Sequence, residues 1–411
     1  PSHVSAELYT WGLDLYDCEG NPEREAHLGA TPQELMASAH ALLESMNIRG
    51  ALGVSAETVQ SFIIACHQGY HPKPFHNFVH ATYVLHGCVL TLQQSPTLMS
   101  LLGPVERVAL CIAALGHDIG HLGVQNPFLM NIDDPLALMY NDQSVLENMH
   151  TSRLFGVLRQ KGCTLLDGLT REGYRQVRKM IIEMIAATDL AGHFDEGTLW
   201  TKFKNRLNTL ADKPFSSETT ADVTMAAGMV LHAADLSGPA RPWKVSFAWS
   251  SKVQEEFVTQ VEMEKQMGAH LLLHAYYRTR LLHAHRTRLL SLPSDHRSHF
   301  SLRTSSMPLT IPHPSSFFAL SHHTSHFSLC SSPLLSTGVP ESKHLTAEKA
   351  QLETGFITLF VAPVWVELHK LLPEVDERVA CLAENRSRWE AMMPPKDPSR
   401  ASSRRSSKEK E

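Results

Sequence analysis

The chain has 411 residues, of which 43% are hydrophobic and 19% are charged, and its formal net charge at pH 7 is −5. This composition is typical of a soluble globular protein, and the length allows one large domain or two ordinary ones. So small a net charge argues against nucleic acid or an anionic membrane as the main partner.

Cysteine usage and hydropathy favour a cytoplasmic location. The seven cysteines are an odd number and form no Cys-x-x-Cys pair, which is typical of reduced thiols in the cytoplasm. No run approaches the ~18 apolar residues of a membrane-spanning helix, and no signal peptide is visible. Because the chain begins at Pro1 without a methionine, we leave room for a missing upstream segment that regulates the protein or tethers it to a membrane.

Hydrophobic periodicity predicts an all-α fold. Apolar residues recur at intervals of three and four in stretches such as 59–66, 105–115, 177–187 and 223–234, which is the pattern of amphipathic or buried helices. Alternating β-branched runs are scarce. We therefore predict one compact multi-helix domain whose main part covers residues 1–268 and whose last helices cover residues 346–393.

Residues 269–345 differ in character from the rest. Leu, Ser, His and Pro dominate, and neither helical nor strand periodicity holds. A compact domain seldom needs so long a structureless segment, so we predict a low-complexity, disordered insert or an artefact of the gene model, such as a retained intron. Its histidines lack the fixed geometry that metal binding needs. The polar tail 394–411 is also predicted to be disordered.

Two short segments carry paired histidines. His76 and His80 are four residues apart, as are His117 and His121, and Asp118 follows His117 directly. On a helix, an i, i+4 interval brings both rings to one face. Imidazole suits zinc and similar metals, whereas carboxylate also suits magnesium or manganese, so the mixture predicts a metal-dependent hydrolase.

The positions of the carboxylates strengthen this interpretation. The apolar run 105–116 ends directly at His117 and Asp118, and the apolar run 229–234 ends at Asp235. A buried unpaired carboxylate is unfavourable, and coordination of a cation is one way to offset that cost. We therefore predict that His80, His117, Asp118 and Asp235 meet at a metal site at the ends of buried helices.

The motifs around these residues closely resemble those of class I 3′,5′-cyclic nucleotide phosphodiesterases. They are His76-Asn77-x-x-His80, His117-Asp118-x-x-His121-x-Gly123-x-x-Asn126, Pro135-Leu136-Ala137-Leu138-x-Tyr140-Asn141-Asp142-x-Ser144-Val145-Leu146-Glu147-Asn148, Thr188-Asp189-Leu190-x-x-His193-Phe194 and His232-Ala233-Ala234-Asp235-Leu236-Ser237-x-Pro239. The resemblance covers about residues 7–268 and 346–393. It implies an HD-type catalytic domain of the signalling kind that hydrolyses cAMP, cGMP or both to the 5′-monophosphate.

The resemblance also implies a division of roles. His80, His117, Asp118 and Asp235 would hold the tighter metal, zinc in the family, and Asp118 would bridge to a second metal, magnesium or manganese. His121, Glu147 and Thr188 would anchor the water molecules around these metals. His76 would be the general acid that protonates the leaving 3′ oxygen, while a hydroxide held between the metals attacks phosphorus.

For the nucleotide, the resemblance implies an apolar clamp on the base and a polar group that reads its edge. Phe356 and Val253 match the clamp, and Asn126 is a further predicted substrate contact. The family glutamine would fall at Glu353, with Gln351 two residues upstream, so either Gln351 serves through a shifted register or Glu353 replaces it. Ionised glutamate accepts hydrogen bonds but cannot donate them.

Two departures from the family pattern leave alternatives open. Gly238 stands where the family has an asparagine, and the insert replaces a short segment beside the nucleotide pocket. The alternatives to an active cyclic-nucleotide phosphodiesterase are a more distant HD-type phosphohydrolase and a catalytically impaired homologue that binds metal or nucleotide without turnover. The preference between cAMP and cGMP stays open.

Overall fold

The computed structural model describes residues 6–17, 23–24, 29–193, 196–267 and 343–393. Over these ranges the fold is helical and contains no β-strand, so the predicted all-α class is confirmed. Nearly all of the predicted insert and the predicted tail lie outside the described residues. The elements in chain order are η1 (Ala6–Tyr9), α2 (Pro32–Ser45), α3 (Ile48–Leu52), α4 (Ala56–Gly69), α5 (Phe78–Gln94), α6 (Pro96–Leu101), α7 (Pro104–Gly116), α8 (Asn126–Asn131), α9 (Pro135–Tyr140), α10 (Val145–Val157), α11 (Arg171–Ala186), η2 (Leu190–His193), α12 (Leu199–Leu207), α13 (Thr220–Asp235), η3 (Gly238–Ala240), α14 (Trp243–Gln266), α16 (Lys343–Phe356), η5 (Ile357–Val361), α17 (Ala362–Leu371), η6 (Pro373–Val375) and α18 (Asp376–Met392).

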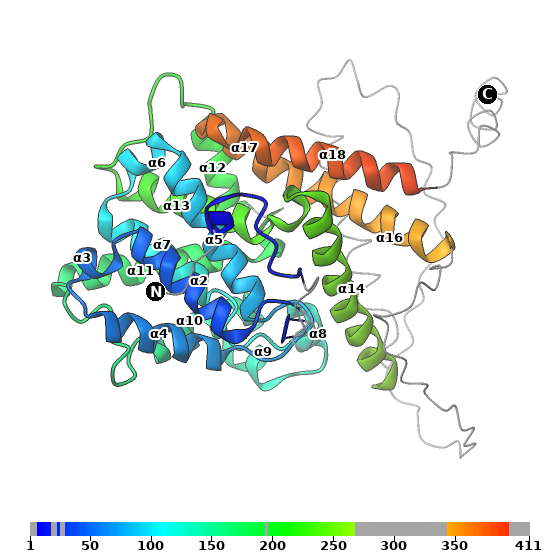
Figure 1. Ribbon diagram of the computed structural model, residues 1–411, viewed down its shortest axis with the longest axis horizontal. Coiled ribbons are helices and arrows are strands. Elements are labelled where there is room, and N and C mark those ends of the chain that lie inside the picture. Colours follow the sequence, from blue (N-terminus) through cyan, green and yellow to red (C-terminus); the bar gives the residue numbers. More distant parts are fainter. Residues whose placement is uncertain (1–5, 18–22, 25–28, 194–195, 268–342, 394–411) are drawn as a thin grey trace.

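Helices α5, α7 and α13 pack against one another at the centre of the molecule (Figure 1). Almost every residue of α5 after Val79 is buried as far as Leu92, and α7 is buried from Val108 to its last residue. Helix α11 packs against both α7 and α13. Because α5, α7 and α13 are largely apolar on all sides, they form the core of the domain, whereas α11 covers it with one apolar face.

The start of α5 is fixed by a side-chain cap. The Asn77 side-chain oxygen accepts hydrogen bonds from the backbone N–H groups of Val79 at 2.8 Å and His80 at 3.4 Å. Its amide nitrogen donates to the Lys73 carbonyl at 2.7 Å. This cap satisfies donors that the first turn of a helix leaves free, and it fixes the entry of the preceding loop beside the first turn of α5.

The last helices of the chain form one side of the domain. Helices α16, α17 and α18 lie together with α14 (Figure 1), and α16 packs against α18. Helix α16 begins at Lys343, three residues before the predicted start of this region, because helix ends are poorly defined by hydrophobic periodicity alone. A single-turn π-helix, η5, joins α16 to α17 and shifts the helical face by part of a turn.

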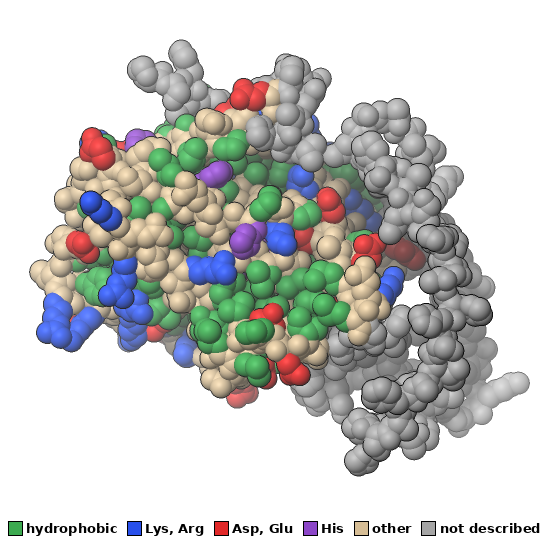
Figure 2. All heavy atoms as spheres, turned by 90° about the horizontal axis from the view of Figure 1, so that it is seen from below, with side chains coloured by type: hydrophobic (Ala, Val, Ile, Leu, Met, Phe, Trp, Pro, Cys, Tyr) green, Lys and Arg blue, Asp and Glu red, His purple; other side chains and the backbone are tan. Residues whose placement is uncertain are grey.

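A smaller apolar cluster lies under α8, α9 and α10 and includes Phe128 and Leu146. On its outer side, Leu138 and Met139 of α9 are 66% and 65% exposed. Figure 2 views the molecule from the side of α8 and α9, and apolar side chains gather on the face that it shows. Among the described residues, none of the helices has the length and apolarity needed to cross a membrane.

Candidate active site

Four side chains from three separate stretches of sequence converge at the predicted metal site. His80, His117, Asp118 and Asp235 each contribute one ligand atom, and these atoms all lie within 4.8 Å of one another. The His80 Nε2 atom lies 3.0 Å from Asp235 Oδ1 and 3.3 Å from Asp118 Oδ2. The His117 Nε2 atom lies 3.3 Å and 3.2 Å from the same two oxygens. The structure therefore brings together the four predicted ligands.

All four groups lie at or beside the ends of buried helices. For His117, Asp118 and Asp235, their position after apolar runs in the sequence predicts this. His117 is the C-cap of α7, and Asp235 is the last residue of α13. His80 lies in the first turn of α5. The hydroxyl of Tyr70 donates to the Leu115 carbonyl at 3.0 Å and accepts from the Asp118 backbone N–H at 3.3 Å, which fixes the turn that carries Asp118.

The charges of these groups fit a divalent cation. The Nδ1 atom of His117 lies 2.8 Å from the Ala114 carbonyl oxygen, to which it donates, so its Nε2 atom faces the two carboxylates. Burial alone would raise the pKa of Asp118, but the neighbouring His117 and His80 hold that pKa well below its usual value. The same two histidines hold the pKa of Asp235 below its usual value against burial. Two imidazole nitrogens and two carboxylates form the donor set of a zinc-type site.

A second group shares the Asp118 carboxylate. Asp118, His121 and His150 also have ligand atoms within 4.8 Å of one another. The Nε2 atom of His150 lies 3.6 Å from Asp118 Oδ1, while its Nδ1 atom is 2.9 Å from the Ile119 carbonyl oxygen. Asp118 thus has one oxygen on each group, as a bridging ligand requires. From the sequence, His150 was expected to pack in the core or support the site without a direct role, because one histidine on a helix carries no signal of its own.

His76 lies beside the four-residue cluster and is held by Glu256 of α14. The His76 Nδ1 atom is 2.5 Å from Glu256 Oε2, and the backbone N–H groups of Phe75 and His76 donate to Glu256 Oε1 at 2.8 Å. Burial lowers the pKa of His76, but the charge and hydrogen bond of Glu256 outweigh it and raise that pKa above its usual value. Glu256 was not predicted, since only the fold brings α14 against the loop before α5.

The histidine spacing was interpreted wrongly in one respect. His76 precedes the N-cap of α5, and His121 lies in the turn after α7, so neither i, i+4 pair lies on one helix. His76 instead stacks on His121, with ring centroids 3.8 Å apart. The Gly123 backbone N–H donates to His121 Nδ1 at 2.9 Å, which leaves the proton on Nε2. Burial, followed by the charge of His76, lowers the pKa of His121 well below its usual value, so His121 is a neutral donor.

Glu147 and Thr188 are the other two residues predicted to anchor water around the metals. The Asn126 amide donates to Glu147 Oε2 at 2.9 Å, and its oxygen accepts from the Leu146 N–H at 2.8 Å. The side chain of Asn126 thus holds Glu147 and the start of α10, and its predicted contact with substrate stays a prediction. Burial and the nearby Asp189 carboxylate raise the pKa of Glu147 to about 8. Thr188 is buried and donates to the Ile185 carbonyl at 2.8 Å.

The loop before α10 is strained and tied to Asp189. Ser144 has a φ of 41°, and Asn141 and Asp142 also have left-handed backbones, which costs energy for residues other than glycine. The Ser144 hydroxyl donates to Asp189 Oδ2 at 2.7 Å. This bond connects the loop before Glu147 with the residue after Thr188 and stabilises the conformation that aims α10 at the site.

Aromatic rings extend from the metal side toward α16. Phe75 lies 4.5 Å from the His80 ring and 4.9 Å from the Trp249 ring, measured between centroids. Trp249 stacks on Phe356 at 6.2 Å. Val253, one helical turn after Trp249 on α14, is partly buried. The predicted clamp residues Phe356 and Val253 therefore lie on the two helices, α16 and α14, that border this side of the site.

The structure distinguishes between the two edge-reading alternatives. Gln351 is exposed on α16, so a shifted register that would bring it inward does not occur. Glu353 is buried and accepts a hydrogen bond from the Ser250 hydroxyl at 2.6 Å. Burial, reduced in part by Ser250 and Lys349, raises the pKa of Glu353. Of the two predicted candidates, the structure favours Glu353 over Gln351 because the helical face of residue 353 is the one turned toward α14.

Gly238 has a steric reason in this chain. A Cβ atom on residue 238 would lie 2.2 Å from the Trp249 ring, which is closer than any real contact. The glycine therefore lets the indole lie directly on η3. The ring occupies the space that a side chain at position 238 would take, so this wall of the site is aromatic where the family has a polar group.

The sequence of the chain matches the family model described as 3′5′-cyclic nucleotide phosphodiesterase over residues 75–282, just over half of its length. The chain belongs to this family. The cyclic nucleotide phosphodiesterase regA of Dictyostelium discoideum is 33% identical over 228 residues, which are 55% of this chain and 28% of that protein. The Drosophila melanogaster dual specificity calcium/calmodulin-dependent enzyme is 35% identical over 215 residues, or 51% of this chain and 24% of that one.

Solved structures agree with this family assignment. The phosphodiesterase domain of the rhodopsin phosphodiesterase fusion protein from the choanoflagellate Salpingoeca rosetta superposes with a TM-score of 0.68 and 26% identity, covering 95% of this chain and 96% of that one. The chain spans only about a quarter of the length of these curated relatives. The resemblance to the family that the motifs indicate is thus confirmed.

Proposed function

We propose that this protein hydrolyses a 3′,5′-cyclic nucleotide, cAMP or cGMP, to the 5′-monophosphate in a metal-dependent reaction. The observation that carries the proposal is the convergence of His80, His117, Asp118 and Asp235 within 4.8 Å. A histidine–carboxylate pair, His76 and Glu256, lies beside them. Metal ligands next to a positioned acid are the groups that phosphodiester cleavage requires.

We propose zinc for the tighter site, since two imidazole nitrogens and two carboxylate oxygens form a favourable set for it. For a second site beside Asp118 we propose magnesium or manganese, with His121, Glu147 and Thr188 holding water around it. When bound, such ions lower the pKa of water and stabilise negative charge on the phosphoryl oxygens. Metal analysis of the purified protein by mass spectrometry tests both assignments.

His76 would serve as the general acid for the departing 3′ oxygen. Its Nδ1 atom faces Glu256, so its Nε2 atom is the one available to the substrate. Because Glu256 raises the pKa of His76, it favours the protonated ring that a general acid requires. After the proton leaves from Nε2, the neutral ring keeps its Nδ1 proton and still donates it to the Glu256 carboxylate, which stays ionised.

Glu353 would read the edge of the base, with Phe356 and Val253 on its faces. A carboxyl group that is protonated can both donate and accept a hydrogen bond, whereas an ionised one only accepts. Burial favours the protonated form of Glu353. The affinity for nucleotide would therefore depend on pH at this position, and the aromatic wall over Gly238 would make little distinction between the two purines.

Incubation of the purified chain with cAMP or cGMP and Mg²⁺ or Mn²⁺ tests the proposal through release of 5′-nucleotide. The second candidate, a binding protein without turnover, is favoured by the replacement of the expected glutamine by Glu353. Nucleotide binding without product would support it. If the protein neither bound nor hydrolysed the nucleotide, both candidates would be contradicted.

The remaining expectations are also proposals. We propose that 269–345 is an insert within one catalytic domain formed by 1–268 and 346–393, because α14 and the helices after residue 343 pack together. We propose the cytoplasm as its location. In the described part of the chain, Cys66, Cys88, Cys111, Cys163 and Cys381 are free thiols, as is usual in a reducing compartment.

A further inference from the structure

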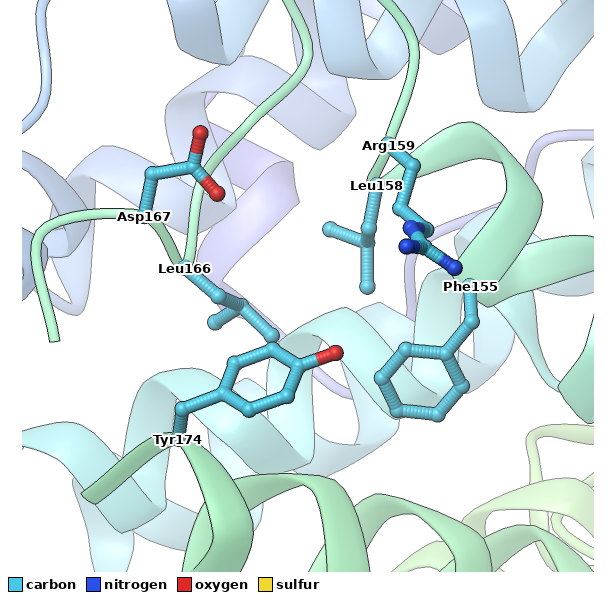
Figure 3. A pocket seen from close by; sticks show the side chains of 6 residues that line it. All are labelled: Phe155, Leu158, Arg159, Leu166, Asp167 and Tyr174. Atoms are coloured by element: carbon cyan, nitrogen blue, oxygen red, sulfur yellow. The ribbon is translucent and has the colours of Figure 1, made fainter. Parts of the chain in front are cut away.

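A cavity of about 290 Å³ lies between the end of α10, the connection that follows it and the first turn of α11 (Figure 3). Its lining residues are Phe155, Leu158, Arg159, Leu166, Asp167 and Tyr174. Neither the metal ligands nor the clamp residues belong to it. Its volume is near the lower end of the range of small-molecule sites, roughly 300–1,000 Å³.

The floor of the cavity is apolar and firmly packed. Phe155, Leu158 and Leu166 are 5%, 4% and 3% exposed, respectively. The Arg178 guanidinium lies 4.2 Å from the centroid of the Phe155 ring, which holds that ring in place by a cation–π contact. The tyrosine hydroxyl points into the space between Leu158 and Phe155 (Figure 3). This floor suits an aliphatic or aromatic group.

Two opposite charges border the same space without neutralising each other. The Arg159 guanidinium and the Asp167 carboxylate both line the cavity, and Figure 3 shows them on different sides of it. Within the described part of the chain, neither side chain makes an ion pair or a hydrogen bond, and the Tyr174 hydroxyl makes no hydrogen bond either. A cation, an anion and a phenol thus remain free to bind a ligand.

We propose that this cavity binds a small zwitterion with an apolar body, of the chemical class of the free apolar α-amino acids. The carboxylate of such a ligand would pair with Arg159, whose fork-shaped guanidinium matches a carboxylate. Its ammonium group would pair with Asp167, and its side chain would lie on Phe155, Leu158 and Leu166. A simple anion would bind less well, because Asp167 would repel it.

The site is independent of the proposed hydrolysis, although one helix connects the two. Glu147 and His150 lie in the first half of α10, whereas Phe155 lies at its end. Binding of a ligand in this cavity can be measured directly on the protein, without an assay of hydrolysis. Failure of either proposal would leave the other standing.

Isothermal titration of the full chain with L-leucine and L-phenylalanine tests the proposal. N-acetyl-L-leucine lacks the ammonium charge and L-leucinamide lacks the carboxylate, so each probe removes one predicted contact. The variants Arg159→Met and Asp167→Asn remove the protein partners. Arg175→Met is the matched control, because Arg175 is exposed on α11, faces Glu172 at 3.9 Å and does not line the cavity.

We expect saturable binding of L-leucine that each cavity variant weakens by about tenfold or more, as for loss of a charge-assisted hydrogen bond. Arg175→Met should bind as the wild type does. Arg159→Met should not weaken L-leucinamide further, and Asp167→Asn should not weaken N-acetyl-L-leucine further. Absence of saturable binding to wild type at millimolar ligand, or equal affinity in the cavity variants and wild type, would overturn the proposal. Arg159 and Asp167 are exposed, so their substitution should leave the fold intact. Thermal unfolding of the variants checks this.

Discussion

The metal side and the base side of the site are built in different ways. On the metal side, ligands come from the ends of buried helices: His117 caps α7, and Asp235 ends α13. On the base side, Phe356 and Glu353 lie along α16 and face α14, which is distant in sequence. The metal side thus depends on where core helices stop, whereas the base side depends on which faces of two helices meet.

This difference predicts different sensitivities. A metal ligand at a helix end is fixed by the packing of the core and has no substitute. The proposed base-reading group can instead be changed by one substitution on a helix face, and here Glu353 stands where the family has a glutamine. Variants on the metal side should therefore lose activity outright, and variants on the base side should change affinity or selectivity.

The largest expected effect is that of Asp118→Ala. This substitution removes the carboxylate shared by both metal groups, so we expect turnover to fall on the order of a thousandfold or more. The content of bound divalent metal should fall with it. Measurement of both kcat and metal stoichiometry checks this, and full metal content with lost activity would contradict the bridging assignment.

His76→Ala should lower kcat by about 10²–10⁴-fold, the usual contribution of a general acid. Its metal content should equal that of the wild type, because His76 is not among the four ligand side chains. His40→Ala, at a partly buried histidine of α2, is the control and should be neutral. Loss of zinc from the His76 variant would show that this residue is a ligand.

Glu256→Gln should lower kcat/KM by about 10–100-fold. The active form of His76 is protonated, and Glu256 raises its pKa, so activity extends to higher pH than a free histidine would allow. Removing the charge lowers this pKa, and the alkaline limb of the pH profile should move to lower pH. An alkaline limb at the same pH in the variant would rule out Glu256 as the partner that sets the His76 pKa.

The smallest effect is expected for Glu353→Gln. In the wild type, KM for nucleotide should rise as pH increases through the raised pKa of Glu353, because the ionised group loses its donor. Glutamine keeps a donor at every pH, so the variant should lose this dependence, with a change of roughly 1 kcal/mol, or about fivefold, per hydrogen bond. Gln351→Ala should leave KM unchanged. A larger effect at Gln351 than at Glu353 would reverse the assignment.

The same contrast explains what could be predicted from the sequence. Long apolar runs that end in His or Asp predict both the helices and the burial of their last residues, so the ligands His117, Asp118 and Asp235 could be found. The all-α class followed from the same runs. Helix boundaries were less certain, and the position of His76 before α5 could not be read from its spacing to His80.

Contacts between distant helices could not be predicted. Glu256 is an ordinary acidic residue in the sequence, and only the packing of α14 against the loop before α5 gives it three hydrogen bonds to Phe75 and His76. The choice between Gln351 and Glu353 depended on the rotation of α16. The hydrogen bond from Asn126 to Glu147, 21 residues away on another helix, carried no signal in the sequence.

The most direct test of the account is a crystal structure of the protein grown with Mn²⁺, with anomalous scattering used to locate the ions. The two proposed metal sites predict one peak within bonding distance of His80 Nε2, His117 Nε2, Asp118 Oδ2 and Asp235 Oδ1, and a second peak beside Asp118 Oδ1. Peaks elsewhere, or a well-ordered cluster whose four side chains bond only to one another in excess Mn²⁺, would contradict it.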